Sequence, residues 1–376
     1  MKNKSVSNPF IVSGFVSKKY FCDRETELDH LLDNVSNGRN VVLYSWRRMG
    51  KTSLIRCFFS QLERTNKAET LYIDLMPSRN MEEAIQAIAR AIHNKYKRTT
   101  RGLSENLVRM LAQLGFSISF DPMSGYPKVE VGLNQLAPPE HSLQALGQFL
   151  AKRKKQVVIA IDEFQQITHY PDVSAEAVFR GWMQSFPQLR LIFSGSHRKM
   201  MQSMFSEQNR PFYKSTQLLD LKPIRSENYG RFIQKHFLAN GMVIEKHHTK
   251  DIYLWSRGQT YTIQLVCNKL FGMRRDVTDT SLKQVYDEII EQEKHVFFHY
   301  SKLLTNTQWA VLKAVAQSEP LTQPQSQEFI SRYRLGAAST VATALKMLTD
   351  KELVVQEDDH YFVHDVLLAR WLQKTG

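Results

Sequence analysis

One eight-residue stretch of the chain has the residue types and spacing that suit the binding of a phosphate group. It reads Ser45-Trp46-Arg47-Arg48-Met49-Gly50-Lys51-Thr52, follows the apolar run 41–44 and precedes a helix-like segment that begins at Ser53. In a strand, turn and helix of this kind, backbone N–H groups and the helix N-terminus face the phosphate anion. The lysine reaches the β- and γ-phosphates and the threonine hydroxyl ligates Mg²⁺. Residues 45–53 therefore predict a nucleoside triphosphate site.

One position departs from the pattern G-x-x-x-x-G-K-[ST], because Ser45 stands where the pattern has glycine. Serine is small and fits such a turn when its backbone φ is negative. We therefore expect the loop to be intact. Guanine-specific signatures of the Asn-Lys-x-Asp type are absent from the sequence, so ATP is the nucleotide that we expect by default.

A second group of candidate residues follows the apolar run 157–161, which ends in Asp162 and Glu163. A run buried on both faces is typical of the centre of a parallel sheet, and ligands bind at the carboxyl ends of such strands. We predict that Asp162 holds Mg²⁺ together with Thr52, and that Glu163 orients and deprotonates the attacking water. Because Glu163 favours water as the acceptor, hydrolysis is preferred over simple binding and over a kinase reaction.

A third strand pattern, residues 189–193, ends in small polar residues before Arg198. If it lies beside the Asp162 strand, Ser194 or Ser196 is placed near the γ-phosphate, and Arg198 senses or neutralises its charge. Arg210 is a candidate arginine finger, acting in cis or from a neighbouring subunit. In the second case, ATP binding would go with assembly of a homo-oligomer. The alternative is that Arg198 and Arg210 are surface arginines.

Composition limits the class of protein. The 376 residues suffice for two or three domains, and the 42% hydrophobic and 23% charged residues are ordinary for soluble globular proteins. The three cysteines are too widely spaced for a disulfide framework or a metal cluster and suit a reducing cytoplasm. No apolar run of about 18 residues occurs, so we expect no membrane insertion and a cytoplasmic location.

The net charge of +13 is unevenly distributed along the chain. Residues 304–376 hold 7 Lys and Arg against 8 Asp and Glu, a net charge of −1, whereas the rest holds 43 against 29, a net charge of +14. A basic surface of this kind suits phosphate binding, a solvated face or contact with DNA. A basic patch at 95–101 belongs to this part of the chain.

The remaining patterns place these residues on elements. Asp23 is expected to cap a helix that runs to about Leu32, and residues 81–96 predict another helix. Residues 70–75 predict a buried strand. Residues 97–140 have the character of an insertion, in which 116–120 and 128–131 predict a hairpin.

The last 73 residues have a winged-helix pattern. Helices are expected at 307–315, 324–333 and 338–348, followed by two short strands around the acidic turn 356–359 and a closing helix. If the module bound DNA, its third helix would offer Ser339, Thr340, Thr343 and Lys346 to the major groove. The acidic turn would repel phosphates, which favours a module that regulates the core or contacts a protein.

In order along the chain, these motifs resemble those of the archaeal-type ATPase family, P-loop ATPases close to the AAA-like and signal-transduction (STAND) NTPases. The matching residues are Phe21-x-x-Arg24-Glu25-x-Glu27-Leu28, Arg47-Arg48-Met49-Gly50-Lys51-Thr52-Ser53, Ile161-Asp162-Glu163-Phe164-Gln165, Ser194-Gly195-Ser196 and Gly258-Gln259-Thr260-Tyr261-x-Ile263-Gln264.

The resemblance implies a RecA-like α/β core with a five-stranded parallel sheet, a small helical lid and a C-terminal winged helix. We assign these to residues 1–225, 226–303 and 304–376. The element 21–28 would lie against the adenine, so that Phe21 and Arg24 contact the nucleotide. Gly258 would let the lid backbone approach it, although Thr260 stands where this family group commonly has proline.

Two functions remain open at the level of sequence. The first is a slow ATP-hydrolysing switch whose nucleotide state controls a protein partner through the lid and winged helix. The second is a nucleotide-gated DNA-binding protein that uses its basic surface and the winged helix. Salt-dependent binding of duplex DNA separates the two.

Overall fold

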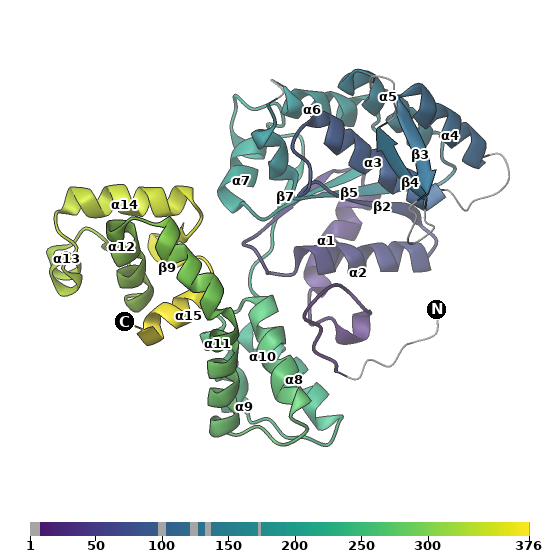
Figure 1. Cartoon of the computed structure of the whole chain (residues 1–376). Helices are drawn as coiled ribbons and strands as arrows, with labels where there is room; N and C mark the ends of the chain where they lie inside the picture. The colour runs from purple at the N-terminus through teal and green to yellow at the C-terminus, as the bar shows by residue number, and fades with distance from the viewer. Residues whose placement is uncertain (1–7, 97–102, 121–126, 132–136, 172–173, 376) are drawn as a thin grey trace. The chain divides into compact units, whose positions relative to one another are not determined.

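The computed structural model describes residues 8–96, 103–120, 127–131, 137–171 and 174–375 (Figure 1). The basic patch predicted at 95–101 lies largely outside these residues. The chain divides into two compact units. We call residues 14–223 the sheet unit, and residues 8–13 with 224–375 the helical unit.

A five-stranded parallel sheet forms the centre of the sheet unit, in the order β2-β5-β6-β1-β7. Its strands are β1 Val41–Tyr44, β2 Ala68–Asp74, β5 Gln156–Asp162, β6 Arg190–Gly195 and β7 Gln217–Asp220. The prediction of a RecA-like core with a parallel sheet is therefore confirmed. All strands point the same way, so the carboxyl ends of β1, β5 and β6 meet along one edge of the sheet.

Successive side chains of a strand point to opposite faces of the sheet, so each face carries its own layer of helices. Val41 and Leu43 of β1 pack in one core, with residues of the helices that begin at Glu25 and Lys51. Val42 packs in a second core on the opposite face. Each fully buried aliphatic side chain of this size contributes about 1.5–3 kcal/mol. The sheet is thus held from both sides, which fixes the edge that carries the candidate site (Figure 1).

The remaining elements of the sheet unit surround this sheet. They are η1 Lys18–Tyr20, α1 Glu25–Ser36, α2 Lys51–Arg64, α3 Met81–Tyr96, α4 Leu103–Gln113, α5 Pro139–Ala151, η2 Phe164–His169, α6 Ala175–Ser185 and α7 Arg198–Ser206, with the antiparallel strands β3 Phe116–Phe120 and β4 Pro127–Val131.

The predicted capping role of Asp23 is wrong. Helix α1 begins at Glu25 and its N-cap is Arg24, without a side-chain cap. Asp23 and Arg24 both have left-handed backbone conformations, with φ of 55° and 80°. This turn directs the buried Arg24 side chain to Glu27 and to the carbonyl oxygen of Lys222, and that contact decides where the helix starts.

Four helices open the helical unit, namely α8 Ser226–Leu238, α9 Lys246–Trp255, α10 Thr260–Gly272 and α11 Asp279–Leu303. The segment that contains Phe10 packs among them. The Phe10 ring contacts Phe237 and Phe271 at centroid distances of 5.4 and 5.8 Å. The side chain of Asn8 donates to the Asn268 carbonyl oxygen, and that of Asn268 donates to the Phe10 carbonyl oxygen.

The winged helix completes the helical unit. Its elements are α12 Asn306–Gln317, α13 Gln327–Tyr333, α14 Ala338–Asp350, β8 Val354–Glu357, β9 His360–Val363 and α15 Val366–Thr375. Asp358 and Asp359 join β8 to β9 with φ of 45° and 61°, as a two-residue type I′ turn requires. The wing tip is therefore acidic. Within the described ranges, no helix has the length and apolarity needed to cross a bilayer.

Candidate active site

The predicted phosphate loop connects β1 to α2. Gly50 is the N-cap of α2 with φ of 94°, and Arg48 has φ of 65°. Ser45, by contrast, keeps out of the left-handed region, so serine fits the position where the pattern has glycine. The loop thus presents the N-terminus of a 14-residue helix to a phosphate group.

Lys51 lies folded over its own loop. Its Nζ atom is 3.3 Å from Ser45 Oγ and 3.4 Å from the carbonyl oxygens of Ser45 and Trp46. Burial lowers the pKa of the Lys51 ammonium, while the charges of Glu163 and Asp162 act in the opposite direction. A phosphate group would provide the charged partner that this buried cation lacks in its own loop.

Thr52 and Asp162 meet although 110 residues separate them. Thr52 Oγ1 donates to Asp162 Oδ2 over 2.8 Å. A hydroxyl and a carboxylate at a helix N-terminus are the hard oxygen donors that suit Mg²⁺. The pair fits the predicted magnesium site, and the assignment of that ion remains a proposal.

Asp162 has another neighbour that the sequence patterns did not indicate. Tyr72 Oη, from β2, donates to the same Oδ2 atom over 2.5 Å. Burial and the adjacent Asp162 charge raise the pKa of Tyr72, so its hydroxyl keeps its proton and remains a donor. Arg56 of α2 covers the Tyr72 ring, with its guanidinium carbon 3.8 Å from the ring centroid. These contacts hold the Asp162 carboxylate in place.

Glu163 follows β5 with a left-handed backbone, φ 53° and ψ 41°. Its Oε2 atom accepts a hydrogen bond from Ser196 Oγ over 2.7 Å and another from the Gln165 side-chain amide. Ser194 is fully buried, and its hydroxyl has no partner among the described residues. Of the two serines at the end of β6, Ser196 is therefore the one that contacts the candidate water-activating carboxylate.

The two candidate arginines have acidic partners. Arg198, the first residue of α7, pairs with Asp220 at the end of β7 and lies 5.9 Å from the Trp46 ring of the phosphate loop. Arg210 pairs with Glu176 of α6 over 3.1 Å. Arg198 is thus beside the phosphate loop, whereas the Arg210 guanidinium is engaged by α6.

The three residues predicted to contact the base are divided between the two units. Phe21 packs edge-on against Phe15, with ring centroids 5.9 Å apart, and Arg24 is engaged as described above. Gly258 belongs to the helical unit, where it has φ of 67° just before α10. Assignment of these three residues to the nucleotide remains a prediction.

The strand order, the Gly-Lys-Thr loop and the strand that ends in Asp-Glu together define a P-loop NTPase. Comparison with known families agrees: the family described as an ATPase domain predominantly from Archaea matches residues 21–266, and a probable winged helix domain matches residues 295–374. The chain belongs to this archaeal-type ATPase family and is a P-loop ATPase with a C-terminal winged helix. The resemblance found in the sequence is thereby confirmed.

Similar solved structures show the same fold. A Walker-type ATPase of Pyrococcus abyssi is 17% identical over 97% of this chain and 99% of its own, with a TM-score of 0.65. The ORC2 protein of Aeropyrum pernix, solved with ADPNP and ADP, is 14% identical over 93% and 92%, with a TM-score of 0.58. The ORC1 protein of the same organism, solved in complex with DNA, is 14% identical over 94% and 93%, with a TM-score of 0.50. No match was found among proteins of curated function.

Proposed function

We propose that this chain is a Mg²⁺-dependent, ATP-hydrolysing switch that acts on a protein partner. The observation that carries the proposal is the convergence of Lys51, the Thr52–Asp162 pair and the Ser196–Glu163 pair at one edge of the sheet. This arrangement offers a phosphate site, an oxygen-ligand pair and a carboxylate base within one cluster.

In the proposed reaction, the loop N–H groups and Lys51 bind the phosphates of ATP, and Glu163 accepts a proton from the attacking water. When bound between Thr52 and Asp162, Mg²⁺ would neutralise charge on the β- and γ-phosphates. We propose that Arg198, which lies 5.9 Å from the Trp46 ring of the loop, stabilises the charge that develops on the transferred group.

Two contacts favour slow basal turnover. Ser196 and Gln165 both donate to Oε2 of Glu163, which occupies this oxygen and leaves Oε1 as the carboxylate atom that can accept a proton from water. A partner that displaced one of these donors would accelerate hydrolysis. This behaviour suits a switch better than a motor with continuous turnover.

The helical unit is the proposed route to the partner. Arg257, just before the Gly258 turn, donates to the Val363 carbonyl oxygen over 2.7 Å and pairs with Glu319 over 3.3 Å. Arg370 of α15 donates to the carbonyl oxygen of Trp255 over 2.8 Å. These contacts tie the winged helix to α9 and α10, so we propose that the lid and winged helix respond to the nucleotide together.

A second candidate function is nucleotide-gated binding of DNA. The net charge of +14 outside residues 304–376 favours it. So does a groove of about 370 Å³ between the start of α12 and α14, whose lining includes the hydroxyl side chains of Ser339, Thr340 and Thr343. The acidic wing tip at Asp358 and Asp359 opposes it, and for this reason a protein partner is preferred.

Salt-dependent binding of a labelled duplex tests the choice between the two functions. We expect no measurable affinity at physiological salt, and little change in the signal between about 50 and 200 mM salt. An affinity that falls by about 10³-fold or more over that range would overturn the partner-switch proposal in favour of DNA.

A further inference from the structure

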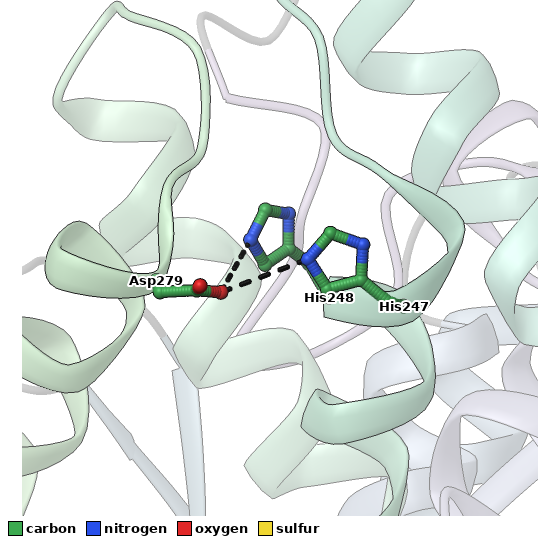
Figure 2. Close-up of side chains that lie close together, drawn as sticks. All are labelled: His247, His248 and Asp279. Carbon is green, nitrogen blue, oxygen red and sulfur yellow. Dashed lines mark hydrogen bonds and ion pairs between the residues drawn. The ribbon is translucent and has the colours of Figure 1, made fainter.

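Within the helical unit, two histidines and a carboxylate converge. His247 and His248 lie in the first turn of α9, and Asp279 is the first residue of α11 (Figure 2). One ligand atom from each residue lies within 4.8 Å of the others. The two histidine Nε2 atoms are 3.6 Å (His247) and 3.0 Å (His248) from the same oxygen, Asp279 Oδ1.

These separations have the size of a metal coordination shell. A tetrahedral ion with bonds of about 2.0–2.1 Å holds its ligand atoms about 3.3 Å apart, and 3.0 and 3.6 Å lie on either side of that value. A hydrogen bond accounts for the approach of His248 to Asp279. It does not account for His247, because 3.6 Å exceeds hydrogen-bond distance.

The orientation of the two rings supports the same interpretation. Neighbouring residues of an α-helix project about 100° apart, so helix geometry alone does not aim both rings at one carboxylate. Here the ring centroids are 3.9 Å apart with an interplanar angle of 42°. Both imidazoles face Asp279 (Figure 2).

Exposure leaves the cluster accessible from one side. The His248 side chain is 6% exposed, whereas those of His247 and Asp279 are 65% and 88% exposed. One ligand is therefore fixed by packing, while the other two border solvent. An ion can enter from solvent, and water can complete its coordination.

We propose that His247, His248 and Asp279 bind a divalent transition metal of the Zn²⁺ class. Imidazole nitrogens with one carboxylate suit Zn²⁺ and Co²⁺. The bound ion would join the N-terminus of α9 to that of α11 and stiffen the lid.

Two features make this site reversible and weaker than a structural zinc site. The positive ends of two helix dipoles oppose a cation. His248 Nδ1 is buried and has no partner among the described residues, so the hydrogen bond that usually tightens a histidine ligand is missing.

The test titrates untagged, metal-free full-length protein with Co²⁺ in the presence of excess Mg²⁺, which fills oxygen-rich sites. We expect one equivalent to bind with the intense visible bands of tetrahedral Co²⁺, and Zn²⁺ to abolish them. His247→Ala should weaken binding at least tenfold. His299→Ala, at an exposed position of α11, is the matched control and should bind like the wild type.

Asp279→Asn separates metal binding from the role of Asp279 at the start of α11, because asparagine still accepts a hydrogen bond but is a poor metal ligand. It should lose Co²⁺ binding and lower the thermal midpoint of the metal-free protein only slightly, since it removes one exposed negative charge from a helix N-terminus. Zn²⁺ should raise the midpoint of the wild type and not that of His247→Ala. No saturable binding by the wild type, or equal binding by His247→Ala, would overturn the proposal.

Discussion

Asp162 Oδ2 accepts hydrogen bonds from Thr52 and Tyr72, and only the first of these partners was predictable from sequence. Thr52 and Asp162 each belong to a motif whose chemistry requires the other, so their meeting could be expected. Tyr72 lies in an apolar strand run, where a tyrosine has the pattern of a core residue. Its contact depends on β2 lying next to β5, and no local signal in the sequence gives that pairing.

The Tyr72 hydroxyl gives a prediction at the residue scale. Tyr72→Phe removes one of two donors to Asp162, so the carboxylate becomes less well positioned. Loss of about 1 kcal/mol corresponds to a roughly fivefold higher Mg²⁺ concentration at half-maximal ATP hydrolysis. Titration of Mg²⁺ at saturating ATP measures this half-maximal concentration.

Tyr96→Phe is the matched control for this experiment. Tyr96 also donates to a carboxylate, that of Glu69, over 2.7 Å, but its contact lies at the opposite end of β2 from Asp74 and Asp162. The Mg²⁺ midpoint of Tyr96→Phe should match the wild type. An unchanged midpoint in Tyr72→Phe would mean that Tyr72 has only a packing role.

At the scale of elements, uniformly apolar runs were the most reliable sequence signal for buried strands. Residues 41–44 form β1, and the run 157–161 lies within β5, because strands buried on both faces need apolar side chains at every position. The predicted start of α1 was wrong. The actual start depends on Arg24, whose side chain donates a hydrogen bond to a carbonyl oxygen 198 residues away. Such a contact leaves no local pattern.

The Arg257–Glu319 pair gives a prediction for the elements that it joins. Burial raises the pKa of the Glu319 carboxyl, and the Arg257 charge opposes that rise. Arg257→Ala leaves Glu319 buried without its charged partner, which should cost about 3–5 kcal/mol. Thermal denaturation of the variant should show a lowered midpoint.

A double variant identifies the cause of the stability that Arg257→Ala loses. Arg257→Ala with Glu319→Gln removes the uncompensated charge, so it should regain part of the lost stability. If the double variant is less stable than Arg257→Ala alone, the buried charge is not the source of the destabilisation.

At the scale of the whole molecule, motif order predicted the class of protein and the presence of a winged helix. The histidine cluster was not predicted, because Asp279 is more than 30 residues from His247 and His248 and no motif joins them. The sequence also predicted a basic excess outside the winged helix. Charge totals, however, do not identify a partner, since the same charge suits phosphate binding, solvation or DNA.

The central claim is that the chain hydrolyses ATP through Glu163. Its most direct test compares nucleotide binding and steady-state hydrolysis, with and without duplex DNA, for the wild type, Glu163→Gln and Lys51→Ala. The wild type should turn over slowly and without stimulation by DNA. Glu163→Gln should bind ATP like the wild type and hydrolyse it about 10²-fold or more slowly, because it lacks the base. Lys51→Ala should lose both activities.

Equal hydrolysis rates for the wild type and Glu163→Gln would contradict the assignment of the base and, with it, this account of the site.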